Sequence, residues 1–197
     1  MLPSFSNASA GASRRELLRA GGATTLSAAA VLLLAGRGTS LAADKGDAAN
    51  DAGILNVALG LEHEGIAAYQ LGAQSGLLKP DVLKTAVLFQ SHHKEHRDLL
   101  AGAIRKLGGT PVAEKKLDEY AKDLNASSLK TQADVLKLAA KLELGATNAY
   151  LGVIPSFSDR ELAKVSGRLA ADETMHWTVL SSALGMPLPQ KAMYFGA

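Results

Sequence analysis

Four long stretches of the chain repeat their apolar residues at helical spacing, and none shows the alternation or the β-branched richness expected of strands. These stretches cover about residues 51–74, 81–107, 131–154 and 158–185. Pro80, Gly108 and Pro155 mark boundaries between them, and Ser158 and Glu161 have the spacing of a capping box at the start of the fourth. The pattern predicts an all-α protein, folded as an antiparallel four-helix bundle over residues 51–186.

Two further segments lie outside the four predicted helices. Residues 112–128, VAEKKLDEYAKDLNASS, are too long for a tight turn. We therefore expect a long crossover between the second and third helices, and a short exposed helix within it. Residues 187–197 form a proline-containing C-terminal tail, and its Met193, Tyr194 and Phe195 could pack on the bundle.

Composition limits the kinds of site that the chain can build. Of its 197 residues, 47% are apolar, which is enough for one sizeable core, so a single domain is expected. Cysteine is absent, so any metal must be held by nitrogen and oxygen atoms. The net charge of +2 comes from the first 43 residues, where four arginines face one glutamate. The remainder has no basic field that would attract nucleic acid.

The N-terminus has the features of an export signal. Ser13, Arg14 and Arg15 precede an apolar run, ATTLSAAAVLLLAG, that is short for a membrane span. This segment resembles a twin-arginine signal peptide, and residues 40–42 offer the small-x-small pattern that signal peptidase needs. We expect residues 1–43 to be the signal, residues 44–50 to be a flexible leader, and the mature protein to be periplasmic or secreted, with no membrane contact after cleavage. An ordinary secretory signal and an uncleaved anchor are the alternatives.

An internal repeat connects the polar residues of the four helices. Glu62 and Glu143 interrupt apolar stripes, and each is followed seven residues later by a tyrosine, Tyr69 or Tyr150. The next helix then carries a residue-x-x-His pair, at 93 and 96 in the first half and at 173 and 176 in the second. The intervals are nearly equal, 31 residues from Glu62 to position 93 and 30 from Glu143 to position 173. Two helical hairpins related by an approximate two-fold axis would bring these residues together.

This spacing suits a metal site. Residues three apart on a helix lie about 60° apart around its axis and about 4.5 Å along it, so both side chains reach the same side of a cation. A buried carboxylate needs a proton or a cation, and imidazole supplies neutral nitrogen donors. The candidate ligands are Glu62, His93, His96, Glu143, Glu173 and His176.

These residues, together with Asp172 in the string DETMH, resemble the ferritin-like superfamily over about residues 51–186. The resemblance implies a glutamate from each of two helices, a Glu-x-x-His pair from the other two, and an aspartate that orients a ligand histidine. The second helix departs from this pattern, because His93 stands where the family has glutamate and His92 where it has aspartate. We expect a terminal nitrogen donor in place of a bridging carboxylate, and hence a more positive site that holds one metal tightly or a metal other than iron.

The sequence leaves the roles of several residues open. His92 is four residues from His96 and could replace His93 as the ligand, or it could hydrogen-bond a carboxylate across the bundle. Tyr69 and Tyr150 could be core residues or could hydrogen-bond carboxylates. His63 is expected at the surface or at an interface. The buried glutamates and histidines could also simply pair with each other.

Three functions from different classes follow. The first is an exported metalloprotein with one or two ions, iron in the leading case, that oxidises Fe(II) or reduces peroxide or dioxygen. The second is a module that binds zinc, manganese or copper without turnover. The third is a metal-free structural or interaction bundle. Metal ions are the expected partners, and a homodimer is one option for the assembly.

Overall fold

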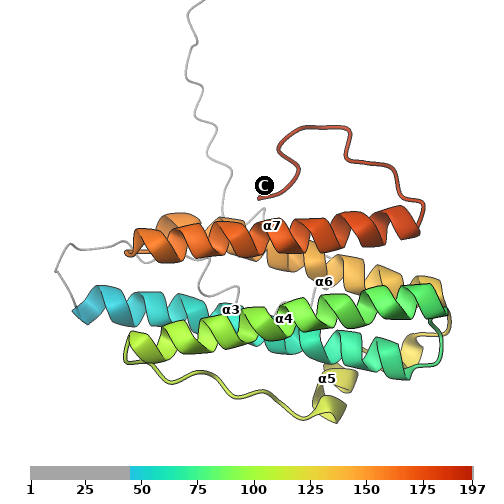
Figure 1. Cartoon of the computed structure of the whole chain (residues 1–197), viewed down its shortest axis with the longest axis horizontal. Helices are drawn as coiled ribbons and strands as arrows, with labels where there is room; N and C mark the ends of the chain where they lie inside the picture. Colours follow the sequence, from blue (N-terminus) through green and yellow to red (C-terminus); the bar gives the residue numbers. More distant parts are fainter. Residues whose placement is uncertain (1–44, 197) are drawn as a thin grey trace, which may run out of the picture.

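The computed structural model describes residues 45–196, and all regular structure within this range is helical (Figure 1). The four long helices are α3 (Lys45–Gln74), α4 (Pro80–Lys106), α6 (Gln132–Val153) and α7 (Arg160–Ala183). The shorter elements are α5 (Leu117–Asp123) and the 3-10 turns η1 (Ala126–Ser128) and η2 (Ile154–Ser156). The predicted all-α four-helix bundle is confirmed. No helix in residues 45–196 is long and apolar enough to cross a membrane.

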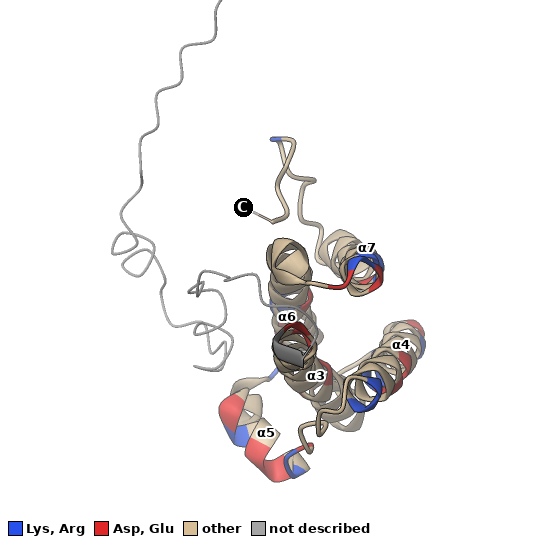
Figure 2. Ribbon diagram, turned by 90° about the vertical axis from the view of Figure 1, so that its left-hand side faces the viewer, with Lys and Arg blue, Asp and Glu red and all other residues tan. Residues whose placement is uncertain are grey.

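The bundle consists of two helical hairpins. Helix α3 packs against α4, and α6 packs against α7, while the closest approach between the hairpins runs along α3 and α6. The chain leaves α4 at one end of the bundle and enters α6 at the other, so the crossover that contains α5 runs along the outside, beside α3 (Figures 1 and 2). Helices α4 and α6 therefore run in the same direction. Helices α4 and α7 approach each other less closely than α3 and α6 do, so side chains fill the space between them.

Local signals explain where the helices begin and end. Pro80 occupies the first turn of α4, and Gly108, at a φ of 80°, follows its last turn. Thr131 caps α6 and exchanges hydrogen bonds with Asp134. The predicted capping box at Ser158 is wrong, because the cap of α7 is Asp159, whose carboxylate accepts the backbone N–H of Glu161 at 2.7 Å.

Two apolar clusters fill the bundle on either side of its middle. One contains Leu59, Leu100, Ile104 and Leu169, and the other contains Phe89, Leu136, Trp177 and Leu180. On each of the four long helices, the candidate ligands lie in the sequence between members of one cluster and members of the other. The site is therefore flanked along the bundle axis by side chains that exclude water.

The start of the first helix differs from the prediction. Residues 45–50, expected as part of a flexible leader, form the first turns of α3. Ala48 and Ala49 are strong helix formers, and Asp47 lies in the first turn, where a negative charge is favourable. The side chain of Asn50 also donates to the carbonyl of Ser156 at 3.2 Å. The predicted signal peptide, residues 1–43, lies outside the described residues.

The crossover and the tail both pack on the bundle. The predicted short crossover helix is present as α5, and its Tyr120 is buried near Ala67 of α3. His63, expected at the surface or at an interface, is buried beneath the crossover, where its Nε2 lies 3.2 Å from the carbonyl of Val112. The tail reaches α7, because the ring of Phe195 stands edge-on to Trp177 with the ring centroids 5.2 Å apart.

Asp51 joins the start of α3 to the start of α7, and its replacement by alanine should destabilise the protein. This buried carboxylate accepts the backbone N–H of Ser158 at 2.9 Å and that of Asp159 at 3.0 Å. Losing both acceptors should lower the free energy of unfolding by about 1–3 kcal/mol, measured by urea denaturation. The matched control is Asp47→Ala, an exposed aspartate one turn earlier, which should change stability by less than about 0.5 kcal/mol. Equal effects of the two variants would contradict the bridging role of Asp51.

Candidate metal centre

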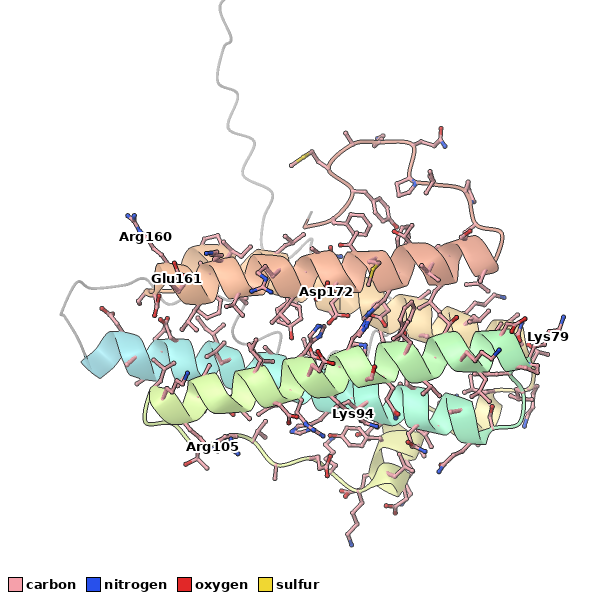
Figure 3. The ribbon with its side chains drawn as sticks, in the orientation of Figure 1. Lys79, Lys94, Arg105, Arg160, Glu161 and Asp172 are labelled. Carbon is pink, nitrogen blue, oxygen red and sulfur yellow. The ribbon has the colours of Figure 1, made fainter. Side chains whose placement is uncertain are left out.

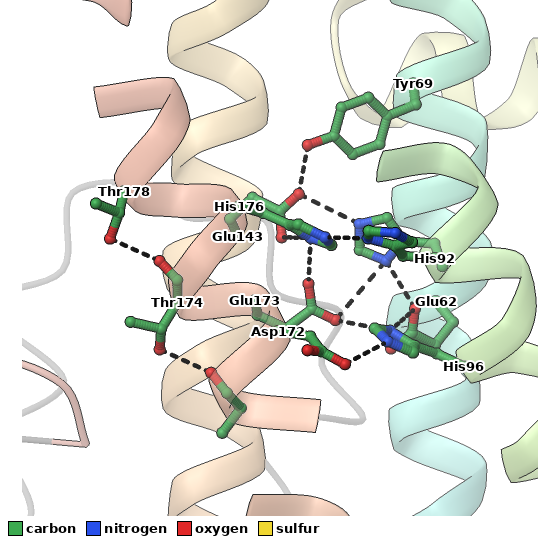
Figure 4. Close-up of polar contacts among 12 residues, drawn as sticks. Glu62, Tyr69, His92, His96, Glu143, Asp172, Glu173, Thr174, His176 and Thr178 are labelled. Carbon is green, nitrogen blue, oxygen red and sulfur yellow. Dashed lines mark hydrogen bonds and ion pairs between the residues drawn. The ribbon is translucent and has the colours of Figure 1, made fainter. Parts of the chain in front are cut away.

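The six candidate ligands are all buried. Figure 4 labels five of them, all except His93, and shows them close together between the helices. Each of the four long helices contributes to the group. Helix α3 supplies Glu62, α4 supplies His93 and His96, α6 supplies Glu143, and α7 supplies Glu173 and His176. The residue-x-x-His spacing places both members of each pair on the inner face of its helix.

These side chains form two overlapping groups of four. The first contains Glu62, His93, His96 and Glu173, and the ligand atoms of its members lie within 4.8 Å of one another. Nδ1 of His93 lies 2.7 Å from Oε2 of Glu62, and Nδ1 of His96 lies 3.2 Å from Oε1 of Glu173. The atoms of this group converge as the ligands of one cation would.

The second group contains His93, Glu143, Glu173 and His176, within the same limit of 4.8 Å. Nε2 of His93 lies 3.2 Å from Oε1 of Glu143, and Nδ1 of His176 lies 3.1 Å from Oε2 of Glu173. His93 and Glu173 therefore belong to both groups. The sequence suggested that His93 would be a terminal donor, but the structure places its ring between the two groups.

Two tyrosines connect the hairpins crosswise. Tyr69 of α3 donates its hydroxyl hydrogen to Glu143 of α6 (Figure 4). Tyr150 of α6 donates its own to Glu62 of α3. Both tyrosines are buried. Each hydrogen bond orients a carboxylate on the opposite hairpin. Tyr150 bonds Oε1 of Glu62, so that Oε2 faces His93 and His96. Tyr69 bonds Oε1 of Glu143, an atom that also contacts His93, while Oε2 of Glu143 faces His176.

Asp172 and His92, the two remaining residues predicted for the site, contact the Nε2 atoms of His96 and His176. Nε2 of His96 lies 3.3 Å from Oδ2 of Asp172, and Nε2 of His176 lies 2.9 Å from Nδ1 of His92. His92 is in neither group of four, so the structure places it as an orienting partner and places His93 among the converging atoms. One orienting partner is anionic and the other is an imidazole, so the two groups differ electrostatically.

The histidines and glutamates of the site stabilise each other's charged forms. Burial alone would raise the pKa of Glu62, but hydrogen bonds from His93 and His96 hold it at about 2. Burial would likewise lower the pKa of His96, yet its contacts with Glu173 and Glu62 raise that pKa to about 10. Glu173 is the exception, because burial raises its pKa even though hydrogen bonds from His176 and His96 act in the other direction.

The other members of the site follow the same pattern. The pKa of Glu143 is lowered against the effect of burial by hydrogen bonds from His176 and His93. The pKa of His93 is raised well above its usual value, again against burial, by hydrogen bonds to Glu143 and Glu62. These directions of pKa shift favour ionised Glu62 and Glu143 beside protonated His93 and His96.

The charge and chemistry of the site fit a transition metal. Within residues 45–196, the ion-pair partners of Glu62, Glu143 and Glu173 are all histidines. Lys79, Arg105 and Arg160, labelled in Figure 3, lie on the outside of the bundle. Three carboxylates and three imidazoles can bind divalent ions once the imidazole protons have left, and nitrogen with oxygen donors suits iron, manganese, zinc or copper.

Two residues that contact the candidate ligands, Gly65 and Phe89, and one buried residue of α6 near Glu143 were missed by sequence reasoning. A Cβ atom on Gly65 would lie 3.1 Å from Nδ1 of His93, so this glycine makes room for the ring. Phe89 stacks on His176 with the ring centroids 4.1 Å apart. Thr147, one turn after Glu143, is fully buried, and its hydroxyl has no hydrogen-bond partner among the described residues. Of these residues, Gly65 was the one that the sequence could have indicated, because it lies one turn after Glu62.

Two cavities approach the site from opposite sides of the bundle. A cavity of about 350 Å³ between α3, α5 and α6 is lined by Gly65, Tyr69, His93 and Glu143, among other residues. A second cavity, of about 310 Å³, lies between α4 and α7, and its lining includes His92, His96 and Asp172. Small molecules therefore have space beside the converging residues.

The comparison with known families agrees with this geometry. The model of the ferritin-like domain family matches residues 50–186, which include both hairpins and the crossover. The chain belongs to the ferritin-like domain family.

The structural comparison shows how far this likeness extends. The ferritin-like domain resembles the crystal structure of a conserved hypothetical protein from Mycobacterium tuberculosis, with a TM-score of 0.59 and 21% identity. The match covers 76% of this chain and 99% of the other. At this identity the likeness supports the fold alone. No curated protein matches the chain.

The stability of the metal-free protein should fall as pH rises from 6.5 towards 10. The pKa of His96 is raised from 6.5 to about 10 in the folded protein. The stabilisation from its protonated ring is therefore complete below pH 6.5 and is lost as pH rises through the folded pKa. On the acid side, the pKa of Glu62 is lowered from 4.5 to about 2, so its contribution is present above pH 4.5 and is lost on descent towards pH 2.

Urea denaturation in a chelator across this pH range measures the effect, with at least about 1 kcal/mol expected between pH 6.5 and 10. Protein saturated with a divalent ion is the comparison, because metal binding requires neutral imidazole and strengthens as pH rises. Metal-free protein that becomes more stable over the same range would contradict the charge pairing described for the site.

Proposed function

We propose that the protein is a metalloprotein that binds two transition-metal ions at the centre of the bundle, with iron as the leading candidate. The observation that carries this proposal is the presence of two four-residue groups that share His93 and Glu173. Buried acids whose only charge partners in residues 45–196 are imidazoles form a site that a cation can complete.

The proposed reaction is redox chemistry, either oxidation of Fe(II) or reduction of peroxide or dioxygen. Bound iron would supply the electrons for such a reaction. Tyr69 and Tyr150 hold the carboxylates of Glu143 and Glu62 in place, and Asp172 and His92 orient the histidines across the bundle. The apolar clusters on either side exclude bulk water, and the 350 Å³ cavity gives a small oxidant room next to Glu143.

The donor set also supports a second candidate, a site that holds zinc, manganese or copper without turnover. Half of the six residues supply nitrogen, and His93 replaces the carboxylate expected at its position. Imidazole-rich sites suit zinc and copper better than sites made of carboxylates alone. Such a site would serve metal handling or the stability of the bundle.

Anaerobic titration of the metal-free protein with Fe(II), followed by air or peroxide, tests the proposal. We expect stoichiometric binding, a higher Tm, and an optical change on adding the oxidant. Zn(II), Mn(II) and Cu(II) are titrated in parallel. Binding of these ions without any change of oxidation state selects the second candidate. If no ion binds in stoichiometric amount, the metalloprotein proposal is wrong.

Glu173→Gln is the sharpest variant for the same measurement. It preserves the shape of a side chain shared by both groups but removes its charge, so metal binding and the metal-induced rise in Tm should both be lost. Glu95→Gln is the matched control, because Glu95 is an exposed acid on α4 next to His96. The control should bind metal as the parent protein does.

We also propose that the protein is exported through the twin-arginine pathway, on the evidence of Arg14 and Arg15 before the apolar run. This route carries folded proteins, so the metal could be acquired in the cytoplasm. Replacing both arginines with lysine should abolish export, measured by cell fractionation and by the mass of the mature N-terminus. Replacement of Arg19 with lysine is the control and should leave export intact. Export of the double variant at the parent level would contradict the assignment.

The homodimer remains a prediction. Five apolar side chains of α4 and α7 are exposed and are compatible with a second copy: Val87, Leu88, Leu99, Met175 and Val179.

A further inference from the structure

We infer that His93 bridges the two metal positions, with Nδ1 as a ligand in the first group and Nε2 as a ligand in the second. This inference rests on the proposed function, because it assigns a role to one residue of that centre. It replaces the terminal donor expected from the sequence with a bridging imidazolate, which is a different kind of ligand.

The position of the ring carries the inference. Nδ1 of His93 lies 2.7 Å from Oε2 of Glu62 and 3.8 Å from Oε1 of Glu173, both in the first group. Nε2, on the other side of the same ring, lies 3.2 Å from Oε1 of Glu143 in the second group. A terminal ligand would direct one nitrogen at the site and the other at an orienting partner, as His96 and His176 do.

Glu173 provides an internal comparison. Its Oε1 lies 3.2 Å from Nδ1 of His96, and its Oε2 lies 3.1 Å from Nδ1 of His176. Glu173 therefore divides its two donor atoms between the groups, as His93 divides its two nitrogens. The two residues hold matching places in the two hairpins, so the approximate two-fold relation pairs a bridging carboxylate with a bridging imidazole.

Charge balance supports the same assignment. Two divalent ions carry four positive charges, and the three glutamates of the centre supply three negative charges. A neutral His93 would leave one uncompensated charge in a buried site, which is costly. An imidazolate at this position makes the centre neutral. Its formation releases the proton of each ring nitrogen to solvent as the two ions bind, so charge and atoms balance.

Gly65 leaves room for the His93 ring at this bridging position. A Cβ at that position would approach Nδ1 to 3.1 Å and Cε1 to 3.2 Å, so a larger residue on α3 would push the ring away. The ring of Tyr69 lies near it at a centroid distance of 5.4 Å.

Electron paramagnetic resonance of the protein loaded with Cu(II) tests the bridge. We expect the purified metal-free protein to bind two equivalents of Cu(II), and we expect an imidazolate to couple their unpaired electrons antiferromagnetically. The integrated spin at low temperature should then fall well below two per protein. A mixed form with one Cu(II) and one Zn(II) should show one full spin. Two independent copper signals that integrate to two spins would overturn the bridge.

Glu173 could also transmit magnetic coupling between the two copper ions. Variants of His93 distinguish its contribution from that of Glu173. His93→Gln should abolish the coupling and should weaken both steps of a Zn(II) titration by more than about tenfold, because a shared ligand serves both ions. His96→Gln is the control and should weaken one step only. A His93→Gln variant that weakens one step only, or that retains the coupling, would identify His93 as a terminal ligand.

The two proposals fail in different ways. If the parent protein binds neither copper nor zinc in stoichiometric amount, the proposed function is wrong, and the bridge falls with it. If two ions bind without coupling, the metal centre stands and only the bridge is wrong.

Discussion

The structure depends on burying three carboxylates in the middle of a helical bundle and neutralising them there. Within residues 45–196, Glu62, Glu143 and Glu173 find their ion-pair partners only among imidazoles of the same cluster. Because unpaired buried charge is costly, all four helices must meet at this level of the bundle. The tyrosines that cross between hairpins and the apolar clusters on both sides follow from that requirement. They fix the acids and keep water from screening the charges.

The two hairpins are alike in plan and different in charge. Each contributes a glutamate, a tyrosine that bonds the other hairpin's glutamate, and a histidine held by a residue from across the bundle. The differences lie at two matching pairs of positions, where α7 has Asp172 and Glu173 and α4 has His92 and His93. The centre is therefore geometrically close to symmetric and electrostatically unequal. In the proposed metal centre, the two positions should therefore differ in affinity and, for a redox metal, in potential.

Much of this arrangement could be predicted from the sequence, because helical periodicity and proline or glycine boundaries are local signals. They located four helices to within a few residues, apart from the earlier start of α3, and the repeat of Glu62 and Tyr69 in Glu143 and Tyr150 indicated a common site. Spacing alone shows only which face a residue occupies. It could not show that the tyrosines bond crosswise, that His93 lies between two groups, or that the crossover buries His63. Those facts depend on how the hairpins dock.

The packing of the tail against α7 has a practical consequence. Trp177 is the only tryptophan of the chain, follows His176 directly, and is buried against Tyr194 and Phe195. Its fluorescence therefore comes from one known place beside the centre. A paramagnetic ion should quench this emission, whereas loss of the tail should expose the indole and shift the emission to longer wavelength. One intrinsic fluorophore thus distinguishes occupancy of the centre from detachment of the C-terminus.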